Sequence, residues 1–143
     1  MARWGFPFPE SSITSRYGVT AGRPNAHRGL DFAVRKNSWI PAATSGTVVL
    51  NTWSDVLGWV LVHSGWDHKQ KRTVFIGYSH LKRQSKLKLG QRIQKGQGIG
   101  IQGNTGTASR GDHLHLTIGP TARHVFIGVT FDPELFIKEM IED

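Results

Sequence analysis

The sequence contains no cysteine among its 143 residues. Disulfide bonds, thiolate metal sites and cysteine nucleophiles are therefore excluded, so any metal must be held by nitrogen and oxygen ligands. Long apolar runs are also missing, since no segment approaches the ~20 residues of a membrane-spanning helix. The N-terminal residues lack the continuous apolar stretch of a signal peptide. We accordingly expect a protein made in the cytoplasm without an export signal and without membrane insertion.

Acidic residues are scarce. There are 10 Asp and Glu against 18 Lys and Arg, and the formal net charge is +8. A chain with this charge is attracted to polyanions such as nucleic acid or an anionic cell wall. The basic residues are scattered rather than continuous, so a solvated basic surface explains most of them. No helix-turn-helix, zinc finger or aromatic stacking motif supports specific binding of nucleic acid.

Short runs of β-branched and aromatic residues dominate the middle of the chain. Segments 46–52, 59–64 and 73–79 are of this type and are bounded by Gly, Ser, Asp or Asn, which predicts strands. Residues 64–72, between two of these segments, are expected to form a hairpin loop. Residues 1–26 are rich in Pro, Gly, Ser and Arg and are expected to wind without regular structure.

Only the C-terminal end has the pattern of a helix. Asp132 suits an N-cap and Pro133 suits the first helical position. The apolar face of this helix is expected to consist of Leu135, Phe136, Ile137, Met140 and Ile141. The length suits one compact domain over residues 1–143. The sequence therefore predicts an all-β domain of antiparallel sheets with a short C-terminal helix.

Two short segments place ligand-type side chains at strand spacing. His27 and Asp31 lie four residues apart, and the neighbouring Gly29 argues against a helix there. In an extended strand, side chains at i, i+2 and i+4 share a face. His113 and His115 share a face for the same reason. Two polar faces of this kind could meet in a groove.

Imidazole nitrogen and carboxylate oxygen are ligands that zinc binds in tetrahedral sites, and a catalytic site keeps one position open. Zinc acidifies water and polarises a carbonyl, and a further histidine can move protons. Each segment alone is a weak signal, because a histidine pair in a strand is more often structural than metal-binding. The co-occurrence of the segments and the sequence around each one carry the argument.

Five phrases follow one another along the chain: HRGLDFA at 27–33, IPAATSGTVV at 40–49, YSHL at 78–81, LGQRIQKGQGIGIQGNTG at 89–106 and DHLHLTI at 112–118. Their order and spacing resemble those of the lysostaphin-type, or LytM-like, family of zinc metallopeptidases. The resemblance covers about residues 12–135, which we take as the catalytic core. It implies an antiparallel β fold related to barrel-sandwich hybrids, with a substrate groove floored by a sheet.

The resemblance also implies roles for five residues. His27, Asp31 and His115 are expected to bind one zinc ion per chain. His113 is expected to act on the attacking water as a base or proton shuttle. His80 is expected to stabilise the oxyanion or to assist proton transfer. The sequence does not divide these two roles between His80 and His113.

The activity implied is hydrolysis of peptide cross-links or stems in bacterial peptidoglycan. Asn25, Tyr78 and Asn104 are candidate substrate contacts. Glycine bridges and D-alanyl–diaminopimelate links both remain open as the bond that is cut. A compact wall hydrolase without an export signal fits a monomeric bacteriophage endolysin that reaches the wall through holin-type pores, with antimicrobial, bacteriolytic action. The basic surface would favour anionic wall polymers.

Two other functions remain as alternatives. A catalytically silent peptidoglycan-binding module would use the same fold, although retention of all five polar residues argues against it. A lipoyl or biotinyl carrier domain shares glycine-bent strands such as GQRIQKGQGIG, but no lysine lies in a recognisable modification turn. Asp112 replaces the proline usual in the family, and we expect it to be a solvated loop residue rather than a partner of a histidine.

Overall fold

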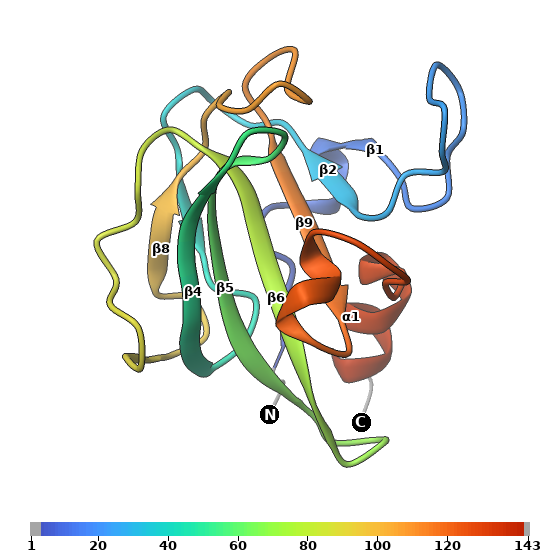
Figure 1. The fold of residues 1–143 in the computed structure, drawn as a ribbon. Coiled ribbons are helices and arrows are strands. Elements are labelled where there is room, and N and C mark those ends of the chain that lie inside the picture. Colours follow the sequence, from blue (N-terminus) through green and yellow to red (C-terminus); the bar gives the residue numbers. More distant parts are fainter. Residues whose placement is uncertain (1–3, 142–143) are drawn as a thin grey trace.

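The computed structural model describes residues 4–141, and its strands form two antiparallel sheets (Figure 1). The larger sheet has seven strands in the order β1-β2-β9-β6-β5-β4-β7, and the smaller pairs β3 with β8. The strands are β1 Ile13–Ser15, β2 Leu30–Phe32, β3 Trp39–Pro41, β4 Gly46–Ser54, β5 Gly58–Asp67, β6 Arg72–Leu81, β7 Arg92–Ile93, β8 Gly98–Ile101 and β9 Leu114–Gly119. Two 3-10 segments, η1 Glu10–Ser12 and η2 Ala122–Val125, and the helix α1 Pro133–Ile141 complete the fold.

The long strands β4, β5 and β6 form the centre of the larger sheet and contain the three segments predicted as strands. The predicted hairpin loop is shorter than expected, because β5 continues to Asp67 and β6 begins at Arg72. The Asp67 carboxylate closes this turn by accepting hydrogen bonds from the backbone N–H groups of Lys69 and Gln70, each at 3.0 Å. The all-β fold with one short C-terminal helix is thus confirmed.

In β2, β9 and β6, the strand register separates residues of the main core from polar residues. Leu30 pairs with Leu116, which pairs with Tyr78, and all three are fully buried in the main core. One residue along each strand, Asp31 pairs with His115, which pairs with Ser79. Because side chains alternate across a sheet, these polar residues face the opposite side from the core.

The helix α1 packs on the core as expected, with one correction. Asp132 Oδ1 accepts hydrogen bonds from the backbone N–H groups of Glu134 (3.0 Å) and Leu135 (3.4 Å), which confirms the predicted N-cap. The predicted apolar face is too wide, because Leu135 and Ile141 are exposed. The buried side chains of α1 are Pro133, Phe136, Ile137 and Met140.

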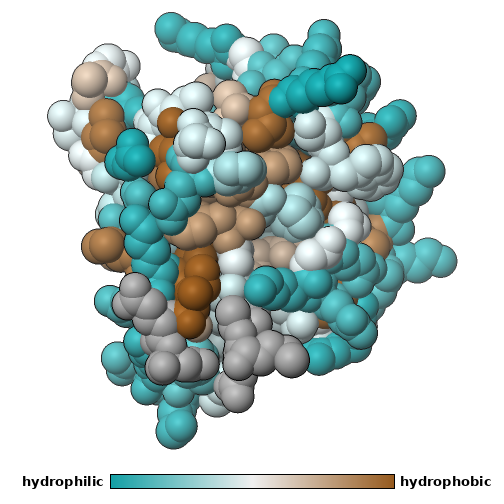
Figure 2. Space-filling view, turned by 180° about the vertical axis from the view of Figure 1, so that it is seen from behind, coloured by the Kyte–Doolittle hydropathy of each residue, from teal (hydrophilic) through white to brown (hydrophobic). Residues whose placement is uncertain are grey.

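The N-terminal segment contributes a core residue that its composition did not indicate. Trp4 is fully buried, its ring meets Phe136 edge-on at 5.1 Å between centroids, and its Nε1–H donates to the Trp66 carbonyl at 3.0 Å. The face opposite to that in Figure 1 shows hydrophilic residues around most of its outline, with apolar residues between them (Figure 2). No helix within residues 4–141 has the length and apolar character needed to cross a membrane.

Candidate metal centre

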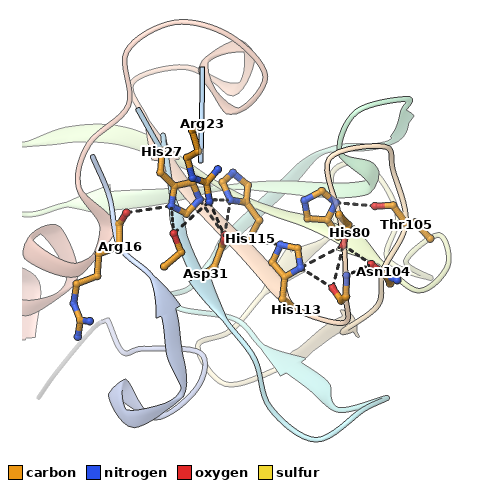
Figure 3. A network of polar contacts seen from close by, with 12 residues as sticks. Arg16, Arg23, His27, Asp31, His80, Asn104, Thr105, His113 and His115 are labelled. Carbon is orange, nitrogen blue, oxygen red and sulfur yellow. Dashed lines mark hydrogen bonds and ion pairs between the residues drawn. The ribbon is translucent and has the colours of Figure 1, made fainter. Parts of the chain in front are cut away.

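Strand pairing and one loop bring three ligand-type side chains together (Figure 3). Asp31 in β2 lies directly opposite His115 in β9, which places their Cβ atoms about 5 Å apart. His27 lies in the loop that precedes β2. Its backbone N–H donates to the Val19 carbonyl at 2.9 Å and its carbonyl accepts from the Gly18 N–H at 2.8 Å. These two hydrogen bonds fix the loop so that the His27 ring lies against the two strand residues.

The donor atoms of the three residues have the spacing of a metal site. His27 Nε2 lies 3.1 Å from Asp31 Oδ1 and 3.2 Å from His115 Nδ1, and the last two atoms lie 2.8 Å apart. Ligands 2.0–2.1 Å from a tetrahedral zinc would be about 3.3 Å from one another. The donor set therefore fits three corners of such a site. Within the described part of the chain, these residues form a buried His/Asp group that could hold a metal ion.

Hydrogen bonding determines which nitrogen of His27 is free. Its Nδ1 lies 3.1 Å from the Arg16 carbonyl oxygen, which can only accept, so Nδ1 carries the proton. The lone pair of Nε2 then points at Asp31 Oδ1 and His115 Nδ1. A histidine that donates its other N–H to a carbonyl is the usual arrangement around a metal.

The charges in this cluster are set by burial and by contact between its members. Burial alone would raise the pKa of Asp31, but the adjacent rings of His115 and His27 outweigh it and hold the pKa well below its ordinary range. Burial lowers the pKa of His115, although Asp31 opposes this shift. An ionised carboxylate beside neutral imidazoles is the protonation state that a metal ion requires.

Two further histidines lie beside the cluster with their Nδ1 atoms engaged in the same way. His80 Nδ1 donates to the Thr105 carbonyl at 2.7 Å, and His113 Nδ1 donates to the Gly111 carbonyl at 2.8 Å. Their rings lie 4.7 Å apart between centroids, and His113 Nε2 is 3.9 Å from Asp31 Oδ2. Burial lowers the pKa of His80 to about 4. Because each Nδ1–H is donated to a carbonyl, Nε2 is the atom of each ring that can act as a base.

A β-bulge in β6 directs His80 into the site. Trp59 pairs with Leu81 and Leu61 pairs with Tyr78, so two residues of β6 stand opposite one residue of β5. His80 occupies the bulge with a left-handed backbone, φ +61°. Alternation alone would place His80 on the core face with Tyr78, whereas the bulge turns it towards His113. Strained backbone of this kind often occurs at functional sites.

The loop between β8 and β9 supplies the carbonyl acceptors for both histidines. Asn104 Oδ1 accepts hydrogen bonds from Ser109 Oγ at 2.5 Å and from the Gly111 N–H at 2.8 Å. Asn104 therefore closes the loop, and its role as a substrate contact stays a prediction. Asn25 is exposed on the loop before His27, and its role also stays a prediction.

The prediction that Tyr78 contacts the substrate is wrong. Tyr78 is fully buried, and its hydroxyl lies 2.8 Å from His63 Nε2 and accepts from the Ala43 N–H at 3.0 Å. Its side chain belongs to the core face of β6, which is opposite to the face that carries Asp31 and His115. Substrate at the metal centre cannot reach it.

The structure adds residues that the motifs did not single out as functional. A Cβ atom on Gly29 would lie 2.5 Å from the Leu116 carbonyl oxygen and 2.6 Å from His115 Cε1, so this glycine makes room for the His115 ring. A cavity of about 180 Å³ opens in front of the cluster and is lined by Arg23, Ala26, His27, Arg28, Asp31, Leu57, His80, Ala108, His113 and His115. Arg23 and Arg28 lie in loop sequence, where no periodic pattern could have indicated them.

Comparison with known proteins gives consistent results for sequence and structure. The profile of peptidase family M23 matches residues 25–126. An uncharacterized metalloprotease of Haemophilus influenzae is 37% identical over 126 residues, which is 87% of this chain and 24% of that protein. The peptidoglycan DD-endopeptidase ShyC of Vibrio cholerae is 34% identical over 101 residues, which is 70% of this chain and 22% of that protein. The chain thus spans about a quarter of the length of these curated relatives.

Two solved structures match over most of both chains. LytU aligns with a TM-score of 0.75 at 30% identity, covering 95% of this chain and 90% of that chain. The catalytic domain of lysostaphin from Staphylococcus simulans aligns with a TM-score of 0.72 at 25% identity, covering 88% and 91%. The five site residues His27, Asp31, His80, His113 and His115 lie within residues 25–126, which match the family profile.

Proposed function

The chain belongs to peptidase family M23, and on this basis we propose that it is a zinc-dependent endopeptidase that hydrolyses peptide bonds of bacterial peptidoglycan. The observation that carries the proposal is the convergence of three ligand atoms from His27, Asp31 and His115 at 2.8–3.2 Å from one another. The family match argues against a lipoyl or biotinyl carrier domain.

Zinc is the metal that suits this donor set. Two imidazole nitrogens and one carboxylate oxygen are a common ligand set of catalytic zinc sites, which keep a fourth position open. The cavity in front of the cluster provides that open side. A bound zinc ion would supply Lewis acidity, which polarises a peptide carbonyl and acidifies water. The family and the neighbouring zinc-containing peptidase of Vibrio cholerae support the same metal.

The residues beside the cluster would move the protons. The Nε2 atom of His113, close to Asp31, would accept a proton from the attacking water and later deliver it to the leaving amine. His80 is held by the Thr105 carbonyl, and burial favours its neutral form. Its Nε2 would assist this proton transfer. Once it has gained a proton, the same Nε2 would stabilise negative charge on the scissile carbonyl oxygen. The bulge at His80 and the loop closed by Asn104 orient the two rings before substrate arrives.

Peptidoglycan is the proposed substrate because the matched relatives include two named peptidoglycan DD-endopeptidases. The net charge of +8 would favour approach to walls that carry anionic polymers. We further propose a bacteriolytic role as a monomeric bacteriophage endolysin, released through holin-type pores. Lysis of cells on co-expression with a pore-forming holin, and none without it, would support this role, whereas secretion of the protein alone would count against it.

The proposed activity can be tested on purified cell walls. Wild-type protein should clear a wall suspension, a chelator should stop the clearing, and added zinc should restore it. Asp31→Asn should lower the rate by more than about a hundredfold, because loss even of an outer partner of a metal ligand costs 10–100-fold. Glu139→Gln, an equivalent change on the exposed side of α1, should retain the wild-type rate. Clearing by the metal-free protein would refute the proposal.

A further inference from the structure

Two arginines line the cavity in front of the metal centre, and they differ in how their donors are used. The Arg28 guanidinium donates to three backbone carbonyls, those of Gly128 at 2.9 Å, Phe126 at 3.1 Å and His124 at 2.5 Å. These bonds attach the segment after η2 to the loop before β2. Arg28 is therefore a structural residue whose hydrogen-bonding capacity is largely used.

Arg23 keeps most of its donors free. Its Nη2 donates to Ser15 Oγ at 3.3 Å and lies 3.7 Å from Asp31 Oδ2. A guanidinium carries five N–H donors in a planar fork, so the others are available. The side chain of Arg23 is 35% exposed, and it lies at the edge of the cavity beside His27 and Asp31 (Figure 3).

The position of Arg23 relative to Asp31 determines whether the positive charge of Arg23 has a counter-ion. Asp31 Oδ1 is the oxygen that faces His27 and His115, whereas Oδ2 faces Arg23. A divalent cation held by Oδ1 would take up the negative charge of Asp31 and leave Arg23 without a counter-ion. Within residues 4–141, no other carboxylate lies within ion-pair distance of Arg23. A loaded site would thus present net positive charge to the cavity.

Positive charge at this place distinguishes between the two cross-link types that the sequence leaves open. The scissile carbonyl must lie at the metal centre, beside Asp31. Because His113 would protonate the leaving nitrogen, that nitrogen would lie near His113 Nε2, which is 3.9 Å from Asp31 Oδ2. Arg23 Nη2 lies 3.7 Å from the same oxygen, so the carbon attached to the scissile nitrogen would lie on the side of Arg23. In a direct D-alanyl–diaminopimelate link that carbon bears a carboxylate, whereas in a glycine bridge it bears none. Arginine binds carboxylates through paired, charge-assisted hydrogen bonds.

We propose that Arg23 binds a free carboxylate on the carbon next to the scissile nitrogen. The enzyme would then favour cross-links whose acceptor residue carries that carboxylate over uncharged glycine bridges. This inference rests on the proposed endopeptidase function and names its substrate class. Arg23 acts as a specificity residue that contacts the substrate, and it takes no part in moving the proton.

The test uses two cross-linked peptides that differ only in this carboxylate, which is free in one and amidated in the other. Wild-type enzyme should cleave the free form with a kcat/KM about 10–100-fold higher, mainly through a lower KM, because the amide leaves the guanidinium unpaired. Arg23→Gln should remove the difference by slowing only the free form, and Arg23→Lys should recover part of it. Arg83→Gln, at an exposed cation in the loop after β6, should behave as wild type.

A binding measurement makes the inference independent of turnover. The acceptor-side product peptide, with its carboxylate free or amidated, is titrated calorimetrically into the zinc-loaded protein. Wild type should bind the free form about tenfold more tightly than the amidated form. Arg23→Gln should bind both forms equally weakly. Equal binding of both forms to wild type would overturn the inference. So would equal loss of both forms in Arg23→Gln, because Arg23 would then act only by positioning Asp31. Failure to cleave either peptide, with the binding difference intact, would instead refute the endopeptidase function.

Discussion

The larger sheet contains two buried histidine clusters, one on each face, and they differ in how their polar atoms are used. On the core face, His63 and Tyr78 form a closed set. His63 Nδ1 donates to the Ser64 carbonyl at 2.7 Å, the Tyr78 hydroxyl donates to His63 Nε2 at 2.8 Å, and it accepts from the Ala43 N–H at 3.0 Å. Every donor in this set meets an acceptor, so it needs no ligand.

On the opposite face, His27, Asp31 and His115 form an open set. The Nδ1–H of His27 is directed outwards to the Arg16 carbonyl, and His27 Nε2, His115 Nδ1 and Asp31 Oδ1 converge on one point. A metal ion bound at that point would contact all three atoms. Both clusters are buried and contain histidine, so the convergence of several ligand atoms on one point is what separates a metal site from a piece of core.

Zinc binding by the open cluster should depend on the space around the His115 ring as well as on the three ligands. Gly29→Ala should weaken zinc binding by about a hundredfold or more, because the new methyl group overlaps the His115 ring and the Leu116 carbonyl. Overpacking of this kind should also cost about 1–3 kcal/mol of stability. Zinc affinity is measured by competition with a chromophoric chelator.

Gly98→Ala is the matched control for this change. Its Cβ would meet only the ring of Trp39, at 3.3 Å, and that side chain is exposed and can move. The control should bind zinc as tightly as wild type. If Gly29→Ala also binds zinc as wild type does, the geometry assigned to the open cluster is wrong.

The difference between the two clusters also shows what the sequence could and could not predict. Alternation predicted that His27 shares a face with Asp31 and that His113 shares a face with His115. Of these four residues, Asp31 and His115 lie in regular strand, where they stand opposite each other, whereas His27 and His113 precede the strands. The same rule fails in β6, where the bulge at His80 shifts the alternation. Tyr78, a predicted substrate contact, precedes the bulge and faces the core.

Loops and helix ends were less predictable for a different reason. Arg28 lies within the motif HRGLD and Arg23 precedes it, but only the tertiary structure shows that Arg28 donates to carbonyls and that Arg23 is largely free. The exposure of Leu135 likewise depends on where α1 meets the core, which its apolar character does not specify. Strand periodicity fixed the fold class, and long-range contacts decided the rest.

The closed cluster should make stability depend on pH. Burial lowers the pKa of His63 from 6.5 to about 4, so between these values the unfolded chain binds a proton that the folded protein does not. Stability from this group is complete above about pH 6.5 and falls as pH drops towards 4, by at most about 3 kcal/mol. His63→Gln should lose this part of the pH dependence in urea unfolding measured from pH 7.5 to 4.5. Parallel curves for the two proteins would contradict the assignment.

The smallest predicted effect comes from a change in the closed cluster that should lower stability and leave catalysis unchanged. Tyr78→Phe removes the hydroxyl that joins His63 Nε2 to the Ala43 N–H, and leaves both without a partner in a dry core. The cost should be about 1–3 kcal/mol of unfolding free energy, measured with chelator present so that metal binding does not contribute.

Tyr17→Phe is the control for this change. It removes a half-buried hydroxyl that donates to the Thr130 carbonyl, where water can substitute, and should cost less. Because Tyr78 lies on the core face, kcat/KM of the zinc-loaded variant should stay within about twofold of wild type; a larger loss would show that the two faces of the sheet are coupled.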